Sequence, residues 1–266
     1  MSKAVLYDAT LCIGCLECER ACAGYNGLEY NDAISAEQQT SERKFTFVRT
    51  LPDDKFMRKL CMHCVDPSCA SVCPVAALTK SKDGPVVYDK SRCMGCRYCM
   101  VACPFDVPKY QWSALLPLVR KCTMCSDRIA KGLATSCSDA CPTGATITGD
   151  RDTLIAEAKK RIAENPSGYV NHIFGETEVG GTAVLMLSSI PFDKAGFRPN
   201  AVYGKGPLPA NTWKALSKIP DVVALGCVAL GGVWWITNRR HEVASAELAA
   251  KKKKSTDTAK PAGGES

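Results

Sequence analysis

Short apolar segments alternate with cysteine-rich loops along the first 150 residues, and this pattern predicts short β-strands joined by structured loops. Val5–Asp8 and Val86–Asp89 have the same order of apolar, aromatic and acidic residues, and each leads into a cysteine-rich loop. Val75–Leu78 and Thr143–Ile147 follow two other loops and have the composition of a turn with a return strand. The 81-residue offset between the first two segments indicates an internal duplication.

The segments outside this repeat predict a hairpin and a helix. Phe45–Arg49 and Lys55–Leu60 flank the turn residues Pro52-Asp53-Asp54 and predict a hairpin inserted at the surface. Asp152 or Thr153 is expected to cap a helix that packs against the cysteine-rich body. Its apolar face consists of Leu154, Ile155, Ala158 and Ile162, and Asn165-Pro166 ends it.

The C-terminal third predicts a strand, a linker and a membrane helix. Thr182–Leu187 predicts the strand, and the Gly- and Pro-containing segment Pro191–Pro209 predicts an extended linker. Ile219–Thr237 contains only one charged residue and just spans a bilayer as a helix, with Trp234 and Trp235 placed as interfacial anchors. A buried core helix is the alternative. The Ala- and Lys-rich end from Ala244 predicts a solvated tail that can touch anionic lipid headgroups.

Basic residues on either side of the apolar segment predict its orientation. They are Lys205, Lys214 and Lys218 upstream and Arg239, Arg240 and Lys251 to Lys254 downstream. This excess predicts a cytoplasmic C-terminus and a periplasmic body in a single-pass protein of the cytoplasmic (inner) membrane. Met1–Thr10 has neither a twin-arginine pair nor an apolar signal region. We therefore expect a leader missing from this sequence or a partner that carries the signal; otherwise the body stays in the cytoplasm.

Cysteine is the residue type that sets this chain apart. The sequence has 266 residues and 17 cysteines, of which sixteen fall between Cys12 and Cys141. The apolar fraction of 46% and the net charge of +7, part of it carried by the tail, are unremarkable and indicate no nucleic-acid binding. Such a cysteine density is typical of a disulfide scaffold or a metal protein.

The sixteen cysteines form four runs of four. Cys12–Cys22 and Cys93–Cys103 read C-x2-C-x2-C-x3-C, while Cys61–Cys73 and Cys122–Cys141 keep the opening C-x2-C and the closing C-x3-C. Three thiolates at this spacing can bind one 4Fe-4S cluster, and the fourth, often followed by Pro, binds a second cluster. The sequence therefore predicts four 4Fe-4S clusters and no three-iron cluster.

Two other chemistries fit the pattern less well. A tetrahedral zinc site uses two C-x2-C pairs and has no use for the third cysteine or the repeated C-x3-C-P. Disulfides need suitably directed partners several ångströms apart, whereas these quartets offer mostly crowded neighbours. The seventeenth cysteine, Cys227, lies in the apolar segment and is expected to pack as a small apolar residue.

The residues leave the pairing of the runs open and indicate no catalytic site. The gaps of 39, 20 and 19 residues between runs permit more than one pairing. The chain lacks a glycine-rich phosphate loop and a nucleophile with a base, so we expect no enzyme activity from it alone.

His63 lies between two predicted ligands, where packing is favoured over a hydrogen bond to sulfur. His172 and His241 are expected to be ordinary surface or core residues. Arg20, Arg92 and Arg97 either favour reduced clusters or are solvated.

The motifs resemble the iron-sulfur (beta) subunits of membrane-bound respiratory oxidoreductases. The resemblance rests on the four runs, the stretch CMHCVDPSC from Cys61, the stretch CRYCMVACP from Cys96, Gly180-Gly181-Thr182 and the C-terminal anchor, and it spans roughly residues 3 to 240. It is nearest to the subunits of hydrogenase-2 and formate dehydrogenase N. It implies an α+β fold with two nested two-cluster ferredoxin-like units, an inserted hairpin and a single C-terminal transmembrane helix.

The resemblance also implies which cysteines share a cluster, because in that family the first run pairs with the fourth and the second with the third. The implied ligand sets are Cys12, Cys15, Cys18 and Cys141; Cys22, Cys122, Cys125 and Cys137; Cys61, Cys64, Cys69 and Cys103; and Cys73, Cys93, Cys96 and Cys99. Cys22 departs from the pattern because Ala23, not Pro, follows it.

The implied function is electron transfer between a catalytic subunit and a quinone-reactive membrane subunit. The catalytic partner would be a nickel-iron hydrogenase or a molybdenum or tungsten pterin enzyme. A subunit of a dimethyl sulfoxide or polysulfide reductase is the alternative, although the anchor favours the first interpretation. The implied divisions are residues 1–59 and 112–150 for the split ferredoxin unit, 60–111 for the second unit, 151–217 for the helix, strand and linker, 218–238 for the membrane helix and 239–266 for a disordered tail.

Overall fold

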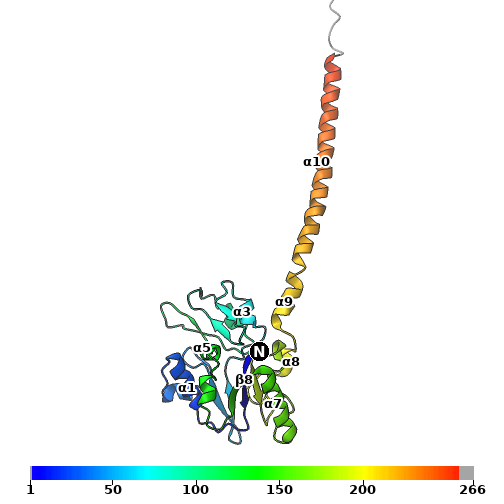
Figure 1. Ribbon diagram of the computed structural model, residues 1–266. Coiled ribbons are helices and arrows are strands. Elements are labelled where there is room, and N and C mark those ends of the chain that lie inside the picture. Colours follow the sequence, from blue (N-terminus) through cyan, green and yellow to red (C-terminus); the bar gives the residue numbers. More distant parts are fainter. Residues whose placement is uncertain (1, 258–266) are drawn as a thin grey trace, which may run out of the picture. The chain divides into compact units, whose positions relative to one another are not determined.

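The computed structural model describes residues 2–257, and the chain divides into two units, Met1–Asn211 and Thr212–Ser266. The first unit mixes short strands with short helices (Figure 1). Its strands are β1 (Lys3–Asp8), β2 (Phe47–Leu51), β3 (Lys55–Lys59), β4 (Leu78–Lys80), β5 (Val86–Tyr88), β6 (Lys109–Tyr110), β7 (Val119–Arg120), β8 (Thr146–Asp150) and β9 (Val184–Leu187). Its helices are α1 (Glu17–Asn26), α2 (Asp32–Ala36), α3 (Ser68–Ser71), α4 (Tyr98–Val101), α5 (Ser126–Ala130), α6 (Ser136–Asp139), α7 (Arg151–Glu164), a 3-10 turn (Glu178–Gly180), α8 (Asn200–Tyr203) and α9 (Leu208–Leu216), which runs into the second unit.

Two strand pairs repeat one arrangement. Strand β1 pairs antiparallel with β8 and places Tyr7 opposite Thr146, while β5 pairs antiparallel with β4 and places Tyr88 opposite Leu78. Thr146 and Leu78 are each the fifth residue after the closing cysteine of a run. The duplication that the sequence pattern predicts is therefore present in the strand register, although the return strands begin later than the predicted segments.

The aspartate at the end of β1 and the aspartate directly after β5 make the same hydrogen bonds to the loops that follow them. The Asp8 carboxylate accepts hydrogen bonds from the backbone N–H and the hydroxyl of Thr10 at 3.0 and 2.6 Å. The Asp89 carboxylate accepts the equivalent pair from Ser91 at 2.9 and 2.6 Å. Asp8 is fully buried and also accepts from Arg161 at 3.0 Å and Tyr169 at 2.9 Å, so it ties the loop to α7 and the segment after it.

The main core lies around the three-stranded sheet β8-β1-β9, in which β9 runs parallel to β1. Strands β1 and β9 are buried along most of their length because α7 covers one side with Leu154 and Ala158. The helix begins earlier than the sequence predicts. Its N-cap is Asp150, not Asp152 or Thr153, and the Asp150 carboxylate pairs with Lys3 at 2.9 Å instead of capping the helix.

The structure agrees with the predicted hairpin but not with the predicted linker. Strands β2 and β3 pair antiparallel around Pro52-Asp53-Asp54, where the pattern predicts a hairpin. The expectation of an extended linker over Pro191–Pro209 is wrong, since it includes α8 and packs against the core. Aromatic side chains cause this: Phe174 is in ring contact with Phe192, Phe197 and Tyr203, with centroids 4.9, 4.5 and 5.5 Å away. Burying these rings outweighs the Gly and Pro content.

The second unit is dominated by α10 (Ile219–Asp257). The helical stretch from Leu208 to Lys252 includes one window with a mean hydropathy of 1.7 that is long and apolar enough to cross a membrane, and none of this window is buried. A buried core helix is thereby disfavoured. The disordered tail predicted from residue 239 is helical as far as Asp257, because Ala, Glu and Lys are strong helix formers; residues 258–266 lie outside the described part.

We expect the buried aspartate of the repeat to matter far more for stability than its exposed counterpart. Asp8→Ala removes the acceptor of the Tyr169 hydroxyl and one of the two carboxylate partners of Arg161, and it should lower the free energy of unfolding by about 3 kcal/mol. Asp89→Ala is the matched control, since its carboxylate makes the same local contacts at the surface, and it should cost much less. Chemical denaturation followed by circular dichroism measures both, and equal losses would contradict the assignment.

A second stability prediction concerns pH. The pKa of His172 is raised by its 2.6 Å hydrogen bond to Glu178. Burial acts to raise the pKa of Glu178, but the hydrogen bonds from His172 and from the Gly175 amide outweigh it, and the pKa of Glu178 is lowered. The raised pKa of His172 stabilises the fold fully below the ordinary pKa of 6.5, and this stabilisation is lost as the pH rises. The lowered pKa of Glu178 stabilises the fold fully above the ordinary pKa of 4.5, and this stabilisation is lost as the pH falls. The melting-temperature difference between wild type and Glu178→Gln should peak between these values and shrink in alkaline buffer. A pH-independent difference would argue against this pair.

Candidate iron-sulfur sites

The four C-x2-C loops share one backbone feature. The residue before the second cysteine is left-handed in every loop, with φ of 69° at Gly14, 48° at His63, 74° at Gly95 and 55° at Met124. Glycine is expected at such a position, and only two of the loops have it. A left-handed residue in a turn is one element of the backbone nests that bind anionic groups.

Proline determines where the helices after the loops end. Helices α3, α4 and α6 stop just before Cys73-Pro74, Cys103-Pro104 and Cys141-Pro142, because proline disfavours helical geometry in the residue before it. A hydrogen-bonded turn follows each closing cysteine, whose carbonyl accepts from the N–H of Ala76, Asp106 or Gly144. Ala23 replaces proline after Cys22, and α1 accordingly continues to Asn26.

Several sulfur atoms already accept hydrogen bonds from the backbone. The N–H of Ala77 donates to Cys73 Sγ at 3.2 Å, that of Met124 to Cys122 Sγ at 3.3 Å, and that of Ser136 to Cys125 Sγ at 3.4 Å. Amide donors stabilise thiolate and sulfide sulfur, and they tune the potential of iron-sulfur centres. The loops are therefore prepared for negatively charged sulfur.

Two cavities gather cysteines from distant runs. One is lined by Cys22 of the first run together with Cys122, Cys125 and Cys137 of the fourth. The other is lined by Cys73 of the second run together with Cys93, Cys96 and Cys99 of the third. Each cavity thus brings together four cysteines that the resemblance assigns to one cluster, although they lie far apart in the sequence.

The remaining cysteines are grouped less completely. Cys64 interacts electrostatically with Cys61, Cys103 and Cys69, the three cysteines that the resemblance assigns to its cluster. Of the first quartet, Cys12 and Cys18 interact with one another. Cys15 lies in the repeated loop, and Cys141 accepts backbone hydrogen bonds from Thr143 and Thr146. Cys227 lies exposed on α10.

Several of these thiols lie where water has little access. Burial raises the pKa of Cys18 to about 11 and that of Cys69 to about 12, and the charges of neighbouring cysteines add to the effect in both. Burial likewise holds the pKa of Cys22 well above its ordinary value. Cys18, Cys22 and Cys69 therefore keep their protons until a metal displaces them, since a bound cation is what stabilises a buried thiolate.

The donor set fits an iron-sulfur cluster better than a single ion. Within residues 2–257, no three His, Cys, Asp or Glu side chains converge closely enough to hold one metal ion. The thiols instead line cavities with amide donors at their edges. Four thiolates around a space, with N–H groups directed at sulfur, are the surroundings that a 4Fe-4S cluster requires.

The three histidines make no such set. His63 is buried, its Nδ1 accepts from the Val86 N–H at 2.9 Å, and burial followed by the charges of Lys121 and Lys80 holds its pKa well below 6.5. Its Nε2 has no hydrogen-bond partner among the described residues. His172 pairs with Glu178, and His241 is exposed on α10.

Sequence reasoning missed the buried and half-buried cations near the thiols. Lys80 donates to the carbonyl oxygens of His63 and Cys64 at 3.0 and 2.8 Å, and buried Lys121 donates to those of Val86 and Cys122 at 2.5 and 2.9 Å. Arg58 is buried beside Cys137. These residues lie outside the cysteine runs, so no local pattern marks them. Arg20 and Arg92, which are close in sequence to the runs, pair with Glu17 and Asp89 at the surface.

Comparisons with known proteins agree with this chemistry. The sequence profile of the 4Fe-4S dicluster domain matches residues 53–151. A protein of Nitratidesulfovibrio vulgaris is 42% identical over 261 residues, which cover 93% of this chain and 70% of the relative. The hydrogenase-2 operon protein HybA of Escherichia coli O157:H7 is 39% identical over 234 residues, with 72% and 71% covered. The nitrate-inducible formate dehydrogenase iron-sulfur subunit of Escherichia coli K12 is 34% identical over 202 residues, with 69% and 67% covered. The chain belongs to the family of iron-sulfur subunits that includes HybA and the formate dehydrogenase iron-sulfur subunits.

Proposed function

We propose that this chain is an electron-transfer subunit that carries four 4Fe-4S clusters and relays single electrons within a respiratory oxidoreductase. The observation that carries the proposal is the pair of cavities in which cysteines of different runs meet as quartets. Thiols spread over more than a hundred residues have no reason to converge in this way unless something binds between them. The family of the chain supports the same chemistry.

The proposed ligand sets join the first run with the fourth and the second with the third. They are Cys12, Cys15, Cys18 and Cys141; Cys22, Cys122, Cys125 and Cys137; Cys61, Cys64, Cys69 and Cys103; and Cys73, Cys93, Cys96 and Cys99. The strand pairs support this, since β1 before the first run pairs with β8 after the fourth, and β5 pairs with β4. The second ferredoxin-like unit is then nested inside the first, together with the β2-β3 hairpin.

A bound 4Fe-4S cluster supplies a centre that accepts and releases one electron. The chain supplies everything else. Cysteine thiolates hold the iron atoms, backbone amides such as that of Met124 donate to sulfur, and buried side chains such as Val119 exclude water. Lys80 and Lys121 hold positive charge close to two of the sites without moving. None of these groups needs to transfer a proton or change its conformation when an electron passes.

The chain is proposed to work between two partners. One is a catalytic subunit of hydrogenase or formate dehydrogenase type, because the relatives carry those names. The other is a quinone-reactive membrane subunit, next to which α10 would anchor the chain in lipid. The basic residues after the apolar segment favour a cytoplasmic C-terminus with the cluster-bearing unit in the periplasm. The names of the relatives favour this function over that of a terminal reductase subunit.

The crossed ligand sets predict which pairs of substitutions act on the same cluster. Cys103→Ser and Cys61→Ser should each remove about four irons, and the double variant should remove about four as well, because both residues bind one cluster. Cys103→Ser combined with Cys93→Ser should remove about eight, although these two cysteines belong to the same run. Iron analysis of the full-length chain purified without oxygen measures these losses.

The control for this series is Cys227→Ser, which removes the one cysteine outside the proposed sets and should leave the iron content unchanged. The opposite pattern, with additive loss for Cys103 and Cys61 and shared loss for Cys103 and Cys93, would show that each run binds its own cluster. It would refute the crossed pairing while leaving the cluster chemistry intact.

The membrane anchor predicts a fractionation result. Truncation after Asn211 removes α10 and should move the chain expressed without partners from the membrane to the soluble fraction. Truncation after His241 keeps the apolar segment and should leave the chain in the membrane, so it is the matched control. A chain ending at Asn211 that stays membrane-bound without partners would contradict anchoring by α10.

A further inference from the structure

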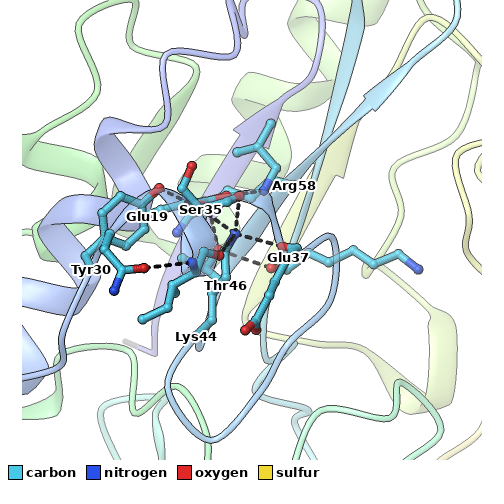
Figure 2. A network of polar contacts seen from close by, with 11 residues as sticks. Glu19, Tyr30, Ser35, Glu37, Lys44, Thr46 and Arg58 are labelled. Atoms are coloured by element: carbon cyan, nitrogen blue, oxygen red, sulfur yellow. Dashed lines mark hydrogen bonds and ion pairs between the residues drawn. The ribbon is translucent and has the colours of Figure 1, made fainter.

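Arg58 is a buried cation at the centre of the cysteine-rich unit. It lies on β3 and is only 1% exposed, which makes it one of the largest fully buried side chains. Its Nε donates to Thr46 Oγ1 at 2.9 Å, and its Nη1 donates to Thr146 Oγ1 on β8 at 3.2 Å. Figure 2 shows Arg58 next to Thr46, at the edge of a network around Lys44 and Glu19. The guanidinium is therefore held in place by two hydroxyl groups.

The neighbouring buried lysine has a carboxylate partner, and Arg58 does not. Lys44 pairs with Glu19 at 2.9 Å, and both side chains are almost completely buried. Among residues 2–257, no carboxylate oxygen lies within 4.0 Å of an Arg58 nitrogen. A guanidinium cannot shed its proton, and a buried charge without a counter-charge costs several kcal/mol. Arg58 therefore requires an anion that no side-chain carboxylate of the described chain supplies.

The groups that face Arg58 are cysteines of two different ligand sets. Arg58 lines the same cavity as Cys22, Cys122, Cys125 and Cys137. It interacts electrostatically with Cys137, Cys18 and Cys22. Cys18 belongs to the first proposed set, and Cys22 and Cys137 belong to the second. Clusters bound by thiolates are anionic, so the missing counter-charge lies on both sites.

We propose that Arg58 is the fixed counter-cation of two neighbouring clusters and that it raises the reduction potentials of both. The inference rests on the proposed function and adds a residue that sets the potential. A positive charge stabilises the more negative, reduced form of a cluster, and burial prevents water and salt from screening it. When one site is oxidised by one electron and the other is reduced by it, the total charge around Arg58 stays the same, so no proton has to move.

The competing interpretation is a structural clamp, in which Arg58 only holds the hairpin against β8 through Thr46 and Thr146. Two substitutions at Thr46 separate charge from clamping. Thr46→Val removes the hydrogen bond and keeps the cation, whereas Thr46→Asp places a carboxylate beside the cation and neutralises it. Arg58→Gln removes the charge itself. Arg20→Gln is the control, because Arg20 is an exposed cation that contacts the Cys15 carbonyl at 3.5 Å and is largely screened.

The experiment is a redox titration of the anaerobically purified full-length chain, monitored by electron paramagnetic resonance. In Arg58→Gln and Thr46→Asp, two of the four one-electron steps should show at least a tenfold lower ratio of reduced to oxidised cluster at a given potential, a shift of about 59 mV. The other two steps should not move. Thr46→Val and Arg20→Gln should change every ratio less than threefold.

The outcomes separate the hypotheses. Unchanged potentials in either charge-removing variant with full iron content, or an equal shift of all four steps, would overturn the proposal. If Arg58→Gln loses its iron, Thr46→Asp decides. If Thr46→Asp also loses iron, the proposal requires that this variant keeps about half of the wild-type iron and that Thr46→Val keeps all of it. Any other pattern of iron loss would overturn the proposal in favour of the structural clamp. The proposed function fails separately, if the wild-type chain lacks the iron for four clusters before any potential is measured.

Discussion

Negative charge on sulfur, buried in a small protein body, is the constraint on which the rest of this structure depends. Sixteen thiols are concentrated in one unit, and several of them lie where an isolated thiolate is unstable. The chain compensates with backbone N–H groups that donate to Cys73, Cys122 and Cys125 and with the cations Arg58, Lys80 and Lys121. These donors and cations are fixed in position. This suits electron transfer, because the protein has to rearrange little when an electron moves.

The same constraint explains the arrangement of the chain. Strand β1 enters the first loop and pairs with β8 after the fourth, so the two ends of the cysteine-rich segment meet in one sheet. Strand β9 adds to the other side of β1 and, with α7, seals the core. Asp8 and Asp89 cap equivalent loops, yet only Asp8 is buried under α7. The added segments thus stabilise one half of the duplication while the other half stays more exposed.

Much of this could be predicted from the sequence because the signals are local. Cysteine spacing predicts the four loops, and the Val-x-Tyr-Asp repeat predicts β1 and β5. The proline after three closing cysteines accounts for the short helices, and its absence after Cys22 for the longer α1.

Other features depend on distant contacts that no local pattern contains. The Pro191–Pro209 segment folds because Phe192 and Tyr203 pack against Phe174. Helix α7 begins earlier than the sequence predicts, and the carboxylate of its N-cap Asp150 pairs with the distant Lys3. Sequence reasoning considered Arg20, Arg92 and Arg97, which lie close to the runs. The buried Arg58 lies in the hairpin and reaches the thiols only in the folded chain.

The most direct test of the account is a combined measurement of iron and acid-labile sulfide in the wild-type full-length chain, purified and reconstituted without oxygen. Four 4Fe-4S clusters require about sixteen irons and about sixteen sulfides per chain. A preparation that holds zinc without sulfide, or that saturates at about eight irons, would contradict the central claim that these cysteines bind four clusters.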